Sequence, residues 1–256
     1  MSSIRERMSR IHIGVLPVDS VSFTEALDVI DELVASKQGG RVFTPNVDHV
    51  VQAEHDARFR EAYSEVSLSL VDGVPLMWAS RWLRKPLPEK ISGSDLVLPL
   101  MERAAERGYR VYFLGGSPGA AELAKQKLLE RFPSLQVVGM FDGRIDVNAP
   151  PETQRPILDD IAEAKTDLLM VALGAPKQEI WSHENRARLG GAVAIGVGAS
   201  LDFVAGTLRR SPRWMSDAGL EWLYRLMQEP RRLAGRYLLR DPQFFRIVAR
   251  QRRAPN

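Results

Sequence analysis

The sequence predicts an α/β protein with a Rossmann-like, doubly wound and mostly parallel sheet, followed by a C-terminal helical appendage. Short apolar runs alternate with segments of helical period through most of the 256 residues. The run at 167–173 is almost entirely apolar, which is typical of a central strand in a parallel sheet. Beyond about residue 206 this alternation stops. We therefore expect an α/β core at residues 1–206 and an appendage at 207–256.

Helix caps, helix-breaking residues and the spacing of apolar residues predict the elements in the first half of the chain. Ser22 begins a helix, because Glu25 three residues later completes a capping box. Asn46 caps the helix that follows the next strand, Ser94 caps a later one, and Gly108 ends that helix. In order, we expect a helix at 22–36, a strand at 41–43, a helix from 47, a strand at 66–71, and helices at 76–83 and 95–106.

The second half continues the same alternation. A glycine-rich turn at 115–119 separates a strand from a helix, and Pro176 opens another helix. The sequence shows no internal repeat. In order, we expect strands at 110–114, 135–140, 167–173 and 192–197, helices at 120–131, 151–164 and from 176, and two appendage helices at 212–228 and 230–249.

The composition excludes several classes of protein. The chain has no cysteine, so disulfides and thiolate metal sites are excluded, and a cytoplasmic protein is expected. Residues 1–10 have no apolar segment of the kind found in signal peptides. No stretch approaches the roughly 20 apolar residues that span a bilayer. We therefore expect a soluble or peripheral protein.

The charge is distributed unevenly, although the net charge is only +3. From Arg209 to the C-terminus there are 12 Arg, no Lys and 4 acidic residues, interleaved with aromatic residues. Such a segment fits an anionic membrane surface, with aromatics at the interface and Arg on lipid head groups. It also fits nucleic acid, or a salt-bridged helical hairpin packed on the core. The segment alone leaves these three readings open.

Polar side chains follow three of the expected strands. Asp72 ends the strand at 66–71, Thr44 and Asn46 follow the strand at 41–43, and Gln178 follows the strand at 167–173. The carboxyl edge of a parallel sheet is where α/β folds bind ligands. Asp72 could act there as a general base toward a hydroxyl. The alternatives are a turn-forming Asp-Gly pair, a helix cap at Asn46 and a solvated first helical turn at Gln178.

Gly115, Gly116 and Ser117 lie in the turn between a strand and a helix, where an anion could meet backbone amides and a helix N-terminus. The turn matches neither Gly-x-Gly-x-x-Gly nor a Walker motif, so an ordinary βα turn fits equally well. The four histidines are scattered without metal-ligand spacing, and there is no Asp-x-Asp pair. We therefore expect neither a metal site nor another cofactor.

The ordered set of motifs resembles the WecG/TagA/CpsF glycosyltransferases, glycosyltransferase family 26. The resemblance runs from about residue 12 to 245. It rests on Thr44-Pro-Asn46, Val71-Asp-Gly-Val-Pro75, Ser92-Gly-Ser-Asp95, Phe113-Leu-Gly-Gly116, Gly174-Ala-Pro-Lys-Gln-Glu179, Gly196-Val-Gly198, Arg210-Ser-Pro, Trp214, Leu220-Glu-Trp-Leu-Tyr-Arg225-Leu and Glu229-Pro230.

This resemblance implies the GT-E type of fold and an inverting transferase. Such enzymes move a sugar from a UDP-sugar to a polyprenyl-diphosphate-linked acceptor at the cytoplasmic face of a bacterial membrane. The products are exopolysaccharide, capsule, common antigen or teichoic acid. The resemblance thus implies a UDP-sugar donor, a lipid-linked acceptor, peripheral attachment through the appendage and no nucleic acid partner. Glucose, N-acetylmannosamine and N-acetylmannosaminuronic acid all fit as the sugar, and a homo-oligomer is compatible with the sequence.

The resemblance also implies roles for individual residues. The family's catalytic aspartate falls on Asp72, its Thr-x-Asn pair on Thr44 and Asn46, and its glutamine on Gln178. The appendage arginines fall on Arg225, Arg232 and Arg236, and would close the site over the departing UDP. The family often has Arg where this chain has Lys90, and Lys lacks the bidentate contact that Arg makes with phosphate.

Two other functions are compatible with parts of the sequence. A nucleotide-dependent oxidoreductase on the same sheet would need a dinucleotide fingerprint and an acidic ribose ligand about 20 residues on, and neither is found. A nonenzymatic module recruited to membrane or RNA by its appendage would leave the polar strand ends without a role.

Overall fold

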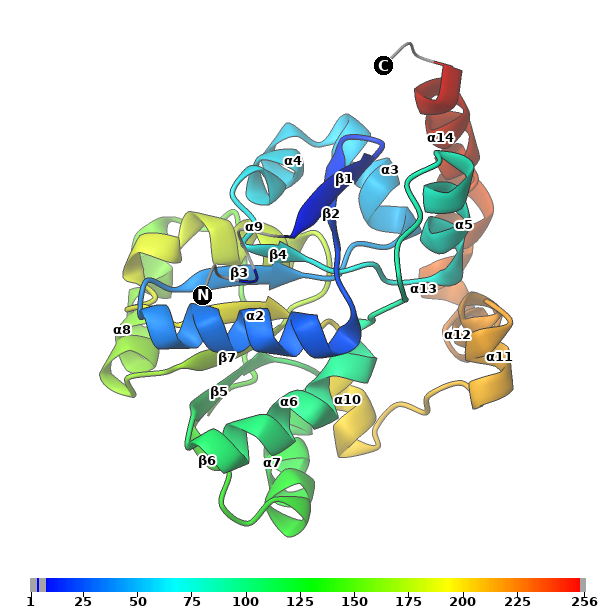
Figure 1. The fold of residues 1–256 in the computed structure, drawn as a ribbon. Coiled ribbons are helices and arrows are strands. Elements are labelled where there is room, and N and C mark those ends of the chain that lie inside the picture. The colour runs from blue at the N-terminus through cyan, green and yellow to red at the C-terminus, as the bar shows by residue number, and fades with distance from the viewer. Residues whose placement is uncertain (1–3, 5–7, 254–256) are drawn as a thin grey trace.

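The computed structural model describes residue 4 and residues 8–253, without the side chains of Arg213, Asp217 and Arg232. Six described strands form one parallel sheet in the order β4-β3-β8-β7-β5-β6 (Figure 1). This confirms the predicted Rossmann-like sheet. Its strands are β3 (Gly40–Phe43), β4 (Leu68–Ser69), β5 (Arg110–Gly115), β6 (Gln136–Phe141), β7 (Leu168–Ala172) and β8 (Val193–Gly196).

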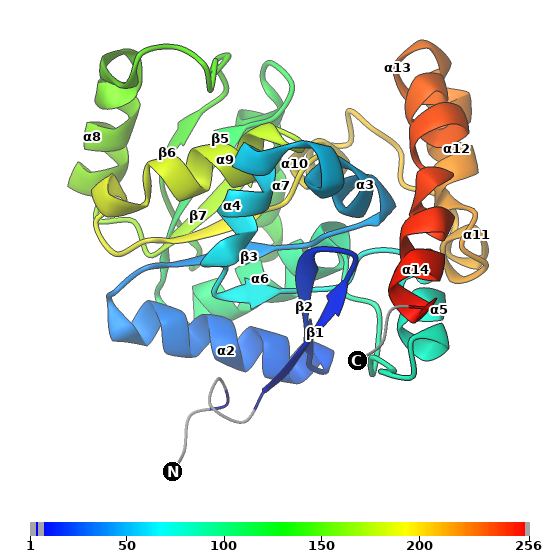
Figure 2. The same ribbon diagram turned by 90° about the horizontal axis from the view of Figure 1, so that it is seen from above.

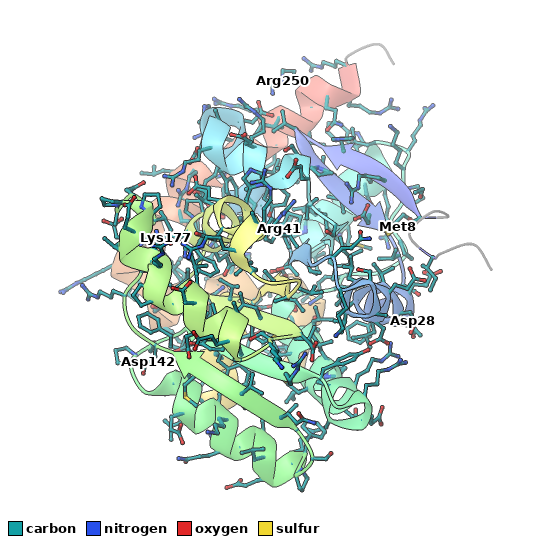
Figure 3. All side chains as sticks on the ribbon, turned by 90° about the vertical axis from the view of Figure 1, so that its left-hand side faces the viewer. Met8, Asp28, Arg41, Asp142, Lys177 and Arg250 are labelled. Carbon is teal, nitrogen blue, oxygen red and sulfur yellow. The ribbon has the colours of Figure 1, made fainter. Side chains whose placement is uncertain are left out.

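Helices cover both faces of the sheet, and side chains fill the space between (Figures 2 and 3). Successive strand residues point to opposite faces. In β5, for example, Val111 and Phe113 belong to one buried cluster and Tyr112 and Leu114 to another. The first face carries α2 (Phe23–Ser36), α6 (Gly93–Arg107), α7 (Ala120–Arg131) and α10 (Ser200–Ala205), and the second carries α3 (Val47–His55), α4 (Ala57–Ser64), η1 (Pro151–Gln154), α8 (Arg155–Glu163), α9 (Lys177–Glu184) and η2 (Arg186–Arg188).

The chain reverses its winding direction between β5 and β7. These strands are neighbours in the sheet, yet α7 follows β5 on one face and α9 follows β7 on the other. The two connections leave in opposite directions, to β6 and to β8. A crevice opens at such a switch point, beyond the carboxyl ends of the strands, and is the usual ligand site of open α/β sheets.

A hairpin near the N-terminus was not predicted. Its strands, β1 (Ser9–Ile13) and β2 (Leu16–Ser20), pair antiparallel across a two-residue turn. Asp19 fastens the hairpin to the sheet, because its carboxylate accepts the backbone N–H of Ser69 at 2.8 Å. The same carboxylate pairs with Arg10 of β1, within the hairpin, at 2.7 Å. The hairpin covers the edge of the sheet next to β4.

The appendage has more breaks than the two predicted helices. Gly219, with φ +74°, separates its first two helices, and Pro242 precedes its last. Phe244, Ile247 and Val248 of that last helix are buried in the cluster that includes α3. The appendage is therefore packed on the α/β body (Figure 2). Its elements are α11 (Arg213–Asp217), α12 (Glu221–Gln228), α13 (Pro230–Gly235), η3 (Arg236–Arg240) and α14 (Gln243–Arg253).

Other boundaries differ from prediction in detail. Ser92, not Ser94, caps α6, because its Oγ accepts the Asp95 N–H at 3.1 Å. The strand expected at 66–71 forms ladder pairs only at β4, which lies at the sheet edge. After it comes α5 (Val74–Trp82). None of the helices in the described residues is both long and apolar enough to cross a membrane.

Candidate active site

A polar cavity of about 450 Å³ lies over the carboxyl edge of the sheet. Residues that follow five different strands line it, namely Thr44 after β3, Asp72 after β4, Gly116 after β5, Gly174 after β7 and Gly198 after β8. The structure therefore brings together the strand ends that the sequence singled out. Gln178, in the first turn of α9, also lines this cavity.

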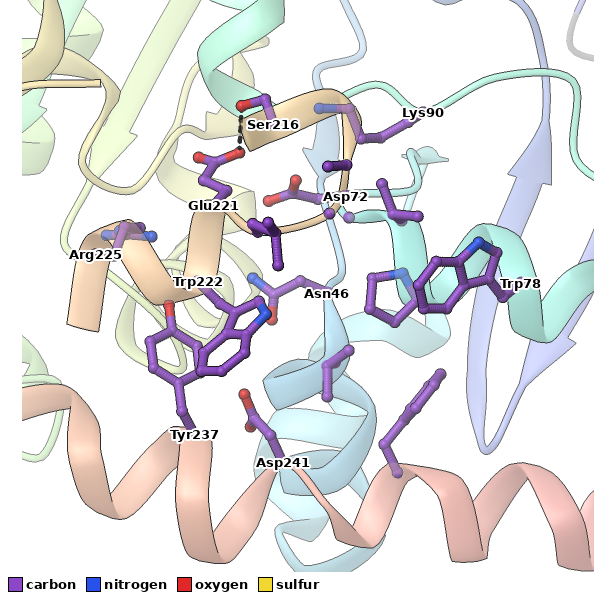
Figure 4. Close-up of a pocket in the computed structure, with 18 of the residues that line it drawn as sticks. Asn46, Asp72, Trp78, Lys90, Ser216, Glu221, Trp222, Arg225, Tyr237 and Asp241 are labelled. Atoms are coloured by element: carbon purple, nitrogen blue, oxygen red, sulfur yellow. Dashed lines mark hydrogen bonds between the residues drawn. The ribbon is translucent and has the colours of Figure 1, made fainter. Parts of the chain in front are cut away.

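A second cavity of about 380 Å³ lies between the α/β body and the appendage. Its wall is largely aromatic and aliphatic (Figure 4). Trp78 comes from α5, Trp222 from α12, Tyr237 from η3, and Phe244 and Phe245 from α14. Most of this wall therefore exists only because the appendage packs against α3 and α5.

The two cavities meet at a charged junction. Five residues line both of them, and four of these carry ionisable groups: Asn46, Asp72, Glu221, Arg225 and Arg236. In Figure 4 the carboxyl groups of Asp72 and Glu221 point into the same space. A reaction between a ligand in the polar cavity and a ligand in the apolar cavity would take place beside these groups.

The environment of Asp72 suits a proton acceptor. Its backbone N–H donates to the Pro45 carbonyl at 2.9 Å, which holds the strand end in place. The pKa of Asp72 is raised to about 7, chiefly by burial of the carboxyl and then by the negative charges of Glu221 and Asp95, whereas Lys90 and Arg225 act in the opposite direction. A carboxyl group with a pKa near neutrality can both take up and release a proton at working pH.

Asn46 both caps a helix and faces the site. Its Oδ1 accepts the His49 N–H at 3.3 Å, as a cap of α3 should, and also accepts from Nη2 of Arg236 at 3.3 Å. The two predicted readings of Asn46, helix cap and site residue, are therefore compatible. Thr44 is buried two residues earlier on the same segment and lines the polar cavity.

Gln178 is held at both ends of its amide. Nε2 donates to Glu179 Oε1 at 2.8 Å, and Oε1 accepts the backbone N–H of Gly198 at 3.0 Å. The side chain is packed tightly, because a Cβ on Gly196 would lie 2.9 Å from its Nε2. Gln178 therefore presents one fixed face to the polar cavity.

The turn after β5, where an anion site is predicted, has two of its backbone amides bonded to carboxylates. The Ser117 N–H donates to Asp202 Oδ1 at 3.2 Å, and the Gly119 N–H donates to Asp142 Oδ2 at 2.8 Å. Gly116 and Ser117 line the polar cavity, but so does the Asp202 carboxylate. A phosphate at this turn would meet an amide that is already engaged and a negative charge.

Gly115 does not line either cavity. It has φ +92°, and a Cβ there would lie 2.7 Å from the Ala172 carbonyl oxygen of β7. Only glycine fits this close approach, so its role in the described structure is conformational.

The predicted cationic residues are divided between the two cavities. Arg225 and Arg236 line both, whereas Lys90 lines only the apolar one and lies 3.5 Å from Asp95. Arg236 lies between two carboxylates, at 3.4 Å from Asp48 and 3.6 Å from Asp241. The side chain of Arg232 lies outside the described part of the structure.

Several residues of the site were missed by sequence reasoning. Glu221 lies four positions before Arg225, which places both side chains on one face of α12. This spacing could have identified Glu221 as a site residue. Asp202 follows Gly198 by four residues, just beyond a strand end. His49, considered only as a metal ligand, lines the polar cavity beside Gln178.

Metal-binding groups do not cluster in the part of the chain that the structure describes. No group of three or more His, Cys, Asp or Glu side chains there is placed to hold a metal ion. The positive charges at the junction come instead from Arg225 and Arg236.

Comparison with known proteins identifies a family and similar individual proteins. Residues 11–256 match the model of a family described as the glycosyl transferase WecG/TagA/CpsF family. The chain is also 31% identical, over 217 residues, to a protein of Bacillus spizizenii (strain ATCC 23059 / NRRL B-14472 / W23). That protein is an N-acetylglucosaminyldiphosphoundecaprenol N-acetyl-beta-D-mannosaminyltransferase, and the match covers 85% of this chain and 81% of the relative.

Proposed function

The chain belongs to the WecG/TagA/CpsF family of glycosyl transferases, and we propose that it moves a sugar from a UDP-sugar to a polyprenyl-diphosphate-linked acceptor. The transfer would invert the anomeric centre and serve the synthesis of a bacterial cell-surface polysaccharide. Membership in a glycosyl transferase family leaves the oxidoreductase and the nonenzymatic binding module without support.

The position of Asp72 carries this proposal. It stands where a polar cavity meets an apolar one, and its carboxyl group is open to both. A transferase with a sugar-nucleotide donor and a lipid-linked acceptor needs one pocket of each kind, joined at the base. Asp72 meets that requirement from a fixed strand end.

The proposed reaction is a single displacement. Asp72 takes the proton of the acceptor hydroxyl as its oxygen bonds to the anomeric carbon of the donor sugar. The bond from that carbon to the UDP oxygen breaks, and its electron pair leaves with UDP. The Asp72 proton is then released to water. This route needs a base in its ionised form and positive charge near the leaving diphosphate.

The charges in the polar cavity favour one orientation of the donor. Asp202 places a carboxylate at the turn after β5, which would repel a diphosphate but accept hydrogen bonds from ribose hydroxyls. Arg225 and Arg236 instead line the part of the polar cavity that is shared with the apolar one, together with Asp72. We therefore propose that the nucleoside lies toward Asp202 and the diphosphate toward the two arginines. This differs from the anion site expected at Gly115, Gly116 and Ser117.

The apolar cavity would take the acceptor. Aromatic walls such as Trp222 and Tyr237 suit a sugar ring and the start of a polyprenyl chain. Lys90, which faces only this cavity, would then lie near the acceptor rather than the leaving UDP. That position offers a reason why Lys can replace the family's Arg here.

We propose that catalysis needs no metal ion, because two arginines stand where the leaving diphosphate would lie. Arg pairs with phosphate through two parallel hydrogen bonds, and its positive charge persists at any working pH. The role would resemble that of a metal ion in neutralising the developing negative charge.

The exposed side chains of the appendage support a position at the inner face of the cytoplasmic membrane. Leu238, Leu239 and Phe245 are all more than 60% exposed, and Trp78 and Trp82 of α5 are more than 50% exposed. Apolar groups of this size beside a basic segment are typical of peripheral membrane contact.

The B. spizizenii relative makes N-acetylmannosamine the first sugar to test, with glucose and N-acetylmannosaminuronic acid as competitors. The experiment is to supply each UDP-sugar with a polyprenyl-diphosphate-linked N-acetylglucosamine acceptor. Transfer of one sugar, with UDP released in equal amount, is the expected outcome. Binding of UDP-sugars without transfer to any lipid-linked acceptor would contradict the proposal.

A further inference from the structure

A fully buried carboxyl group lies directly behind Gln178. Glu179, in the same first turn of α9, is 0% exposed, and its Oε1 accepts from Gln178 Nε2 at 2.8 Å. Its other oxygen, Oε2, has no hydrogen-bond partner among the described residues. Burying a carboxyl oxygen without a partner costs folding free energy.

No described cation compensates this group. The side chains that face it are Tyr63 of α4 and His49 and Asp48 of α3. The His49 ring nitrogen Nδ1 is 4.0 Å from Oε1 and 2.8 Å from the Tyr63 hydroxyl. Burial lowers the pKa of His49 to about 3, so the imidazole is neutral at working pH.

Burial without a described cation nearby raises the proton affinity of the Glu179 carboxyl. The pKa of Glu179 is raised to about 7, chiefly by burial; hydrogen bonds from Gln178 and from the Glu179 backbone lower it, and the negative charge of Asp48 raises it. A raised pKa means that the folded state binds the proton more tightly than the unfolded state. Glu179 therefore makes folding less favourable as pH rises from about 4.5 to about 7.

The contacts of Gln178 suggest a role for the buried Glu179 carboxyl. The Gly198 N–H can only donate, so it selects the amide oxygen of Gln178. Oε1 of Glu179 accepts, so it selects the amide nitrogen. Together they exclude the flipped amide and leave one N–H and one lone pair for a ligand in the polar cavity.

We propose that Glu179 is a positioning residue, which fixes the orientation of the Gln178 amide so that it can hold the donor sugar. This inference rests on the proposed transferase function, and Glu179 itself would not touch the substrate. It acts through Gln178, and its buried, unpartnered oxygen reduces stability as a consequence.

Two substitutions separate positioning from packing. Glu179→Gln removes the charge but keeps an oxygen that can accept from Gln178. Glu179→Leu keeps a similar side-chain volume but removes both the charge and the oxygen that accepts from Gln178. Glu184→Gln is the control, because Glu184 lies on the same helix but pairs with Arg58 at the surface, outside both cavities.

We expect Glu179→Leu to lower kcat/KM for the UDP-sugar about 10-fold, through the loss of one fixed hydrogen bond. We expect Glu179→Gln to stay within about threefold of wild type and to resist urea better than wild type, with a gain that grows from about pH 4.5 to about pH 7. Glu184→Gln should change neither kcat/KM for the UDP-sugar nor the pH dependence of the resistance to urea.

Three outcomes with the variants would overturn the inference. Glu179→Leu could retain wild-type kcat/KM, or Glu179→Gln could lose as much activity as Glu179→Leu. Alternatively, both variants could lose stability and activity in parallel at every pH, which would show that Glu179 only packs.

A wild-type enzyme that transfers no sugar would overturn this inference and the proposed function together. An active wild type with an unaffected Glu179→Leu variant would overturn this inference alone.

Discussion

The carboxyl groups of Asp72 and Glu221 face the same junction between two cavities, although one follows β4 and the other begins α12. Glu221 is held by Ser216, whose hydroxyl donates to it at 3.2 Å (Figure 4). After burial itself, Glu221 is the largest influence that raises the pKa of Asp72. The appendage therefore does more than cover the site, because it also changes the proton affinity of the candidate base.

The first prediction concerns pH. Asp72 accepts a proton only when ionised, so kcat/KM should fall as pH drops below about 7. Glu221→Gln removes a negative neighbour, which lowers the pKa of Asp72 and moves this acid limb to lower pH. Lys90, Asp95 and Arg225, the other charged groups that act on Asp72, stay in place. The check is kcat/KM measured across pH, and an acid limb that does not move would disprove the coupling.

The second prediction concerns the leaving group. Arg225→Ala should slow sugar transfer by about 10²-fold, since it removes a charged donor from the proposed position of the diphosphate. Binding to anionic liposomes should change much less. Arg246→Ala is the matched control, because Arg246 is exposed on α14 and lines neither cavity. Single-turnover rates and co-sedimentation measure the two properties. Equal effects of the two substitutions on the transfer rate would exclude a role for Arg225 at the diphosphate.

The third prediction concerns metal ions. Transfer should survive EDTA if, as proposed, the arginines at the junction neutralise the leaving diphosphate in place of a metal ion. The check is the initial rate after dialysis against EDTA, with and without added Mg²⁺ or Mn²⁺. Loss of activity that returns only with the metal would show that the arginines are insufficient.

The fourth prediction concerns the membrane. Leu239 is 77% exposed on η3, next to Leu238 at 61%. Replacing both with Glu should weaken binding to anionic vesicles, because it removes apolar contact and adds repulsion. Activity on a short-chain, water-soluble acceptor should persist, since neither residue lines a cavity. Binding by the wild type should weaken as salt rises. Unchanged vesicle binding by the double variant would place the membrane contact elsewhere.

Much of the fold could be predicted because its signals are local. The capping box at Ser22 and Glu25 and the glycine stop at Gly108 are present as expected. The hairpin at residues 9–20 was missed because its strands are short and are fixed by a distant contact, from Asp19 to Ser69. Both appendage helices were predicted without a break, but Gly219 interrupts the first and the second is interrupted just before α14, where Pro242 lies.

Only the site residues that directly follow a predicted strand could be identified from the sequence. Asp72, Thr44 and Gln178 each follow an apolar run, and parallel strands bring such positions to one edge. Glu221 enters the site through the packing of the appendage, which no local pattern specifies. Asp202 accepts the Ser117 N–H of the glycine turn, and this tertiary contact, which weighs against a phosphate there, is likewise specified by no local pattern.

The most direct test of the whole account is the transfer rate of Asp72→Asn under single-turnover conditions, with a lipid-linked acceptor and the UDP-sugar that the wild type uses. The substitution keeps the shape of the side chain and removes the base. The rate should fall roughly 10²–10⁴-fold, while the Kd for the UDP-sugar, measured by calorimetry, stays nearly unchanged. A variant that transfers sugar within about threefold of the wild-type rate would contradict the assignment of Asp72 as the base.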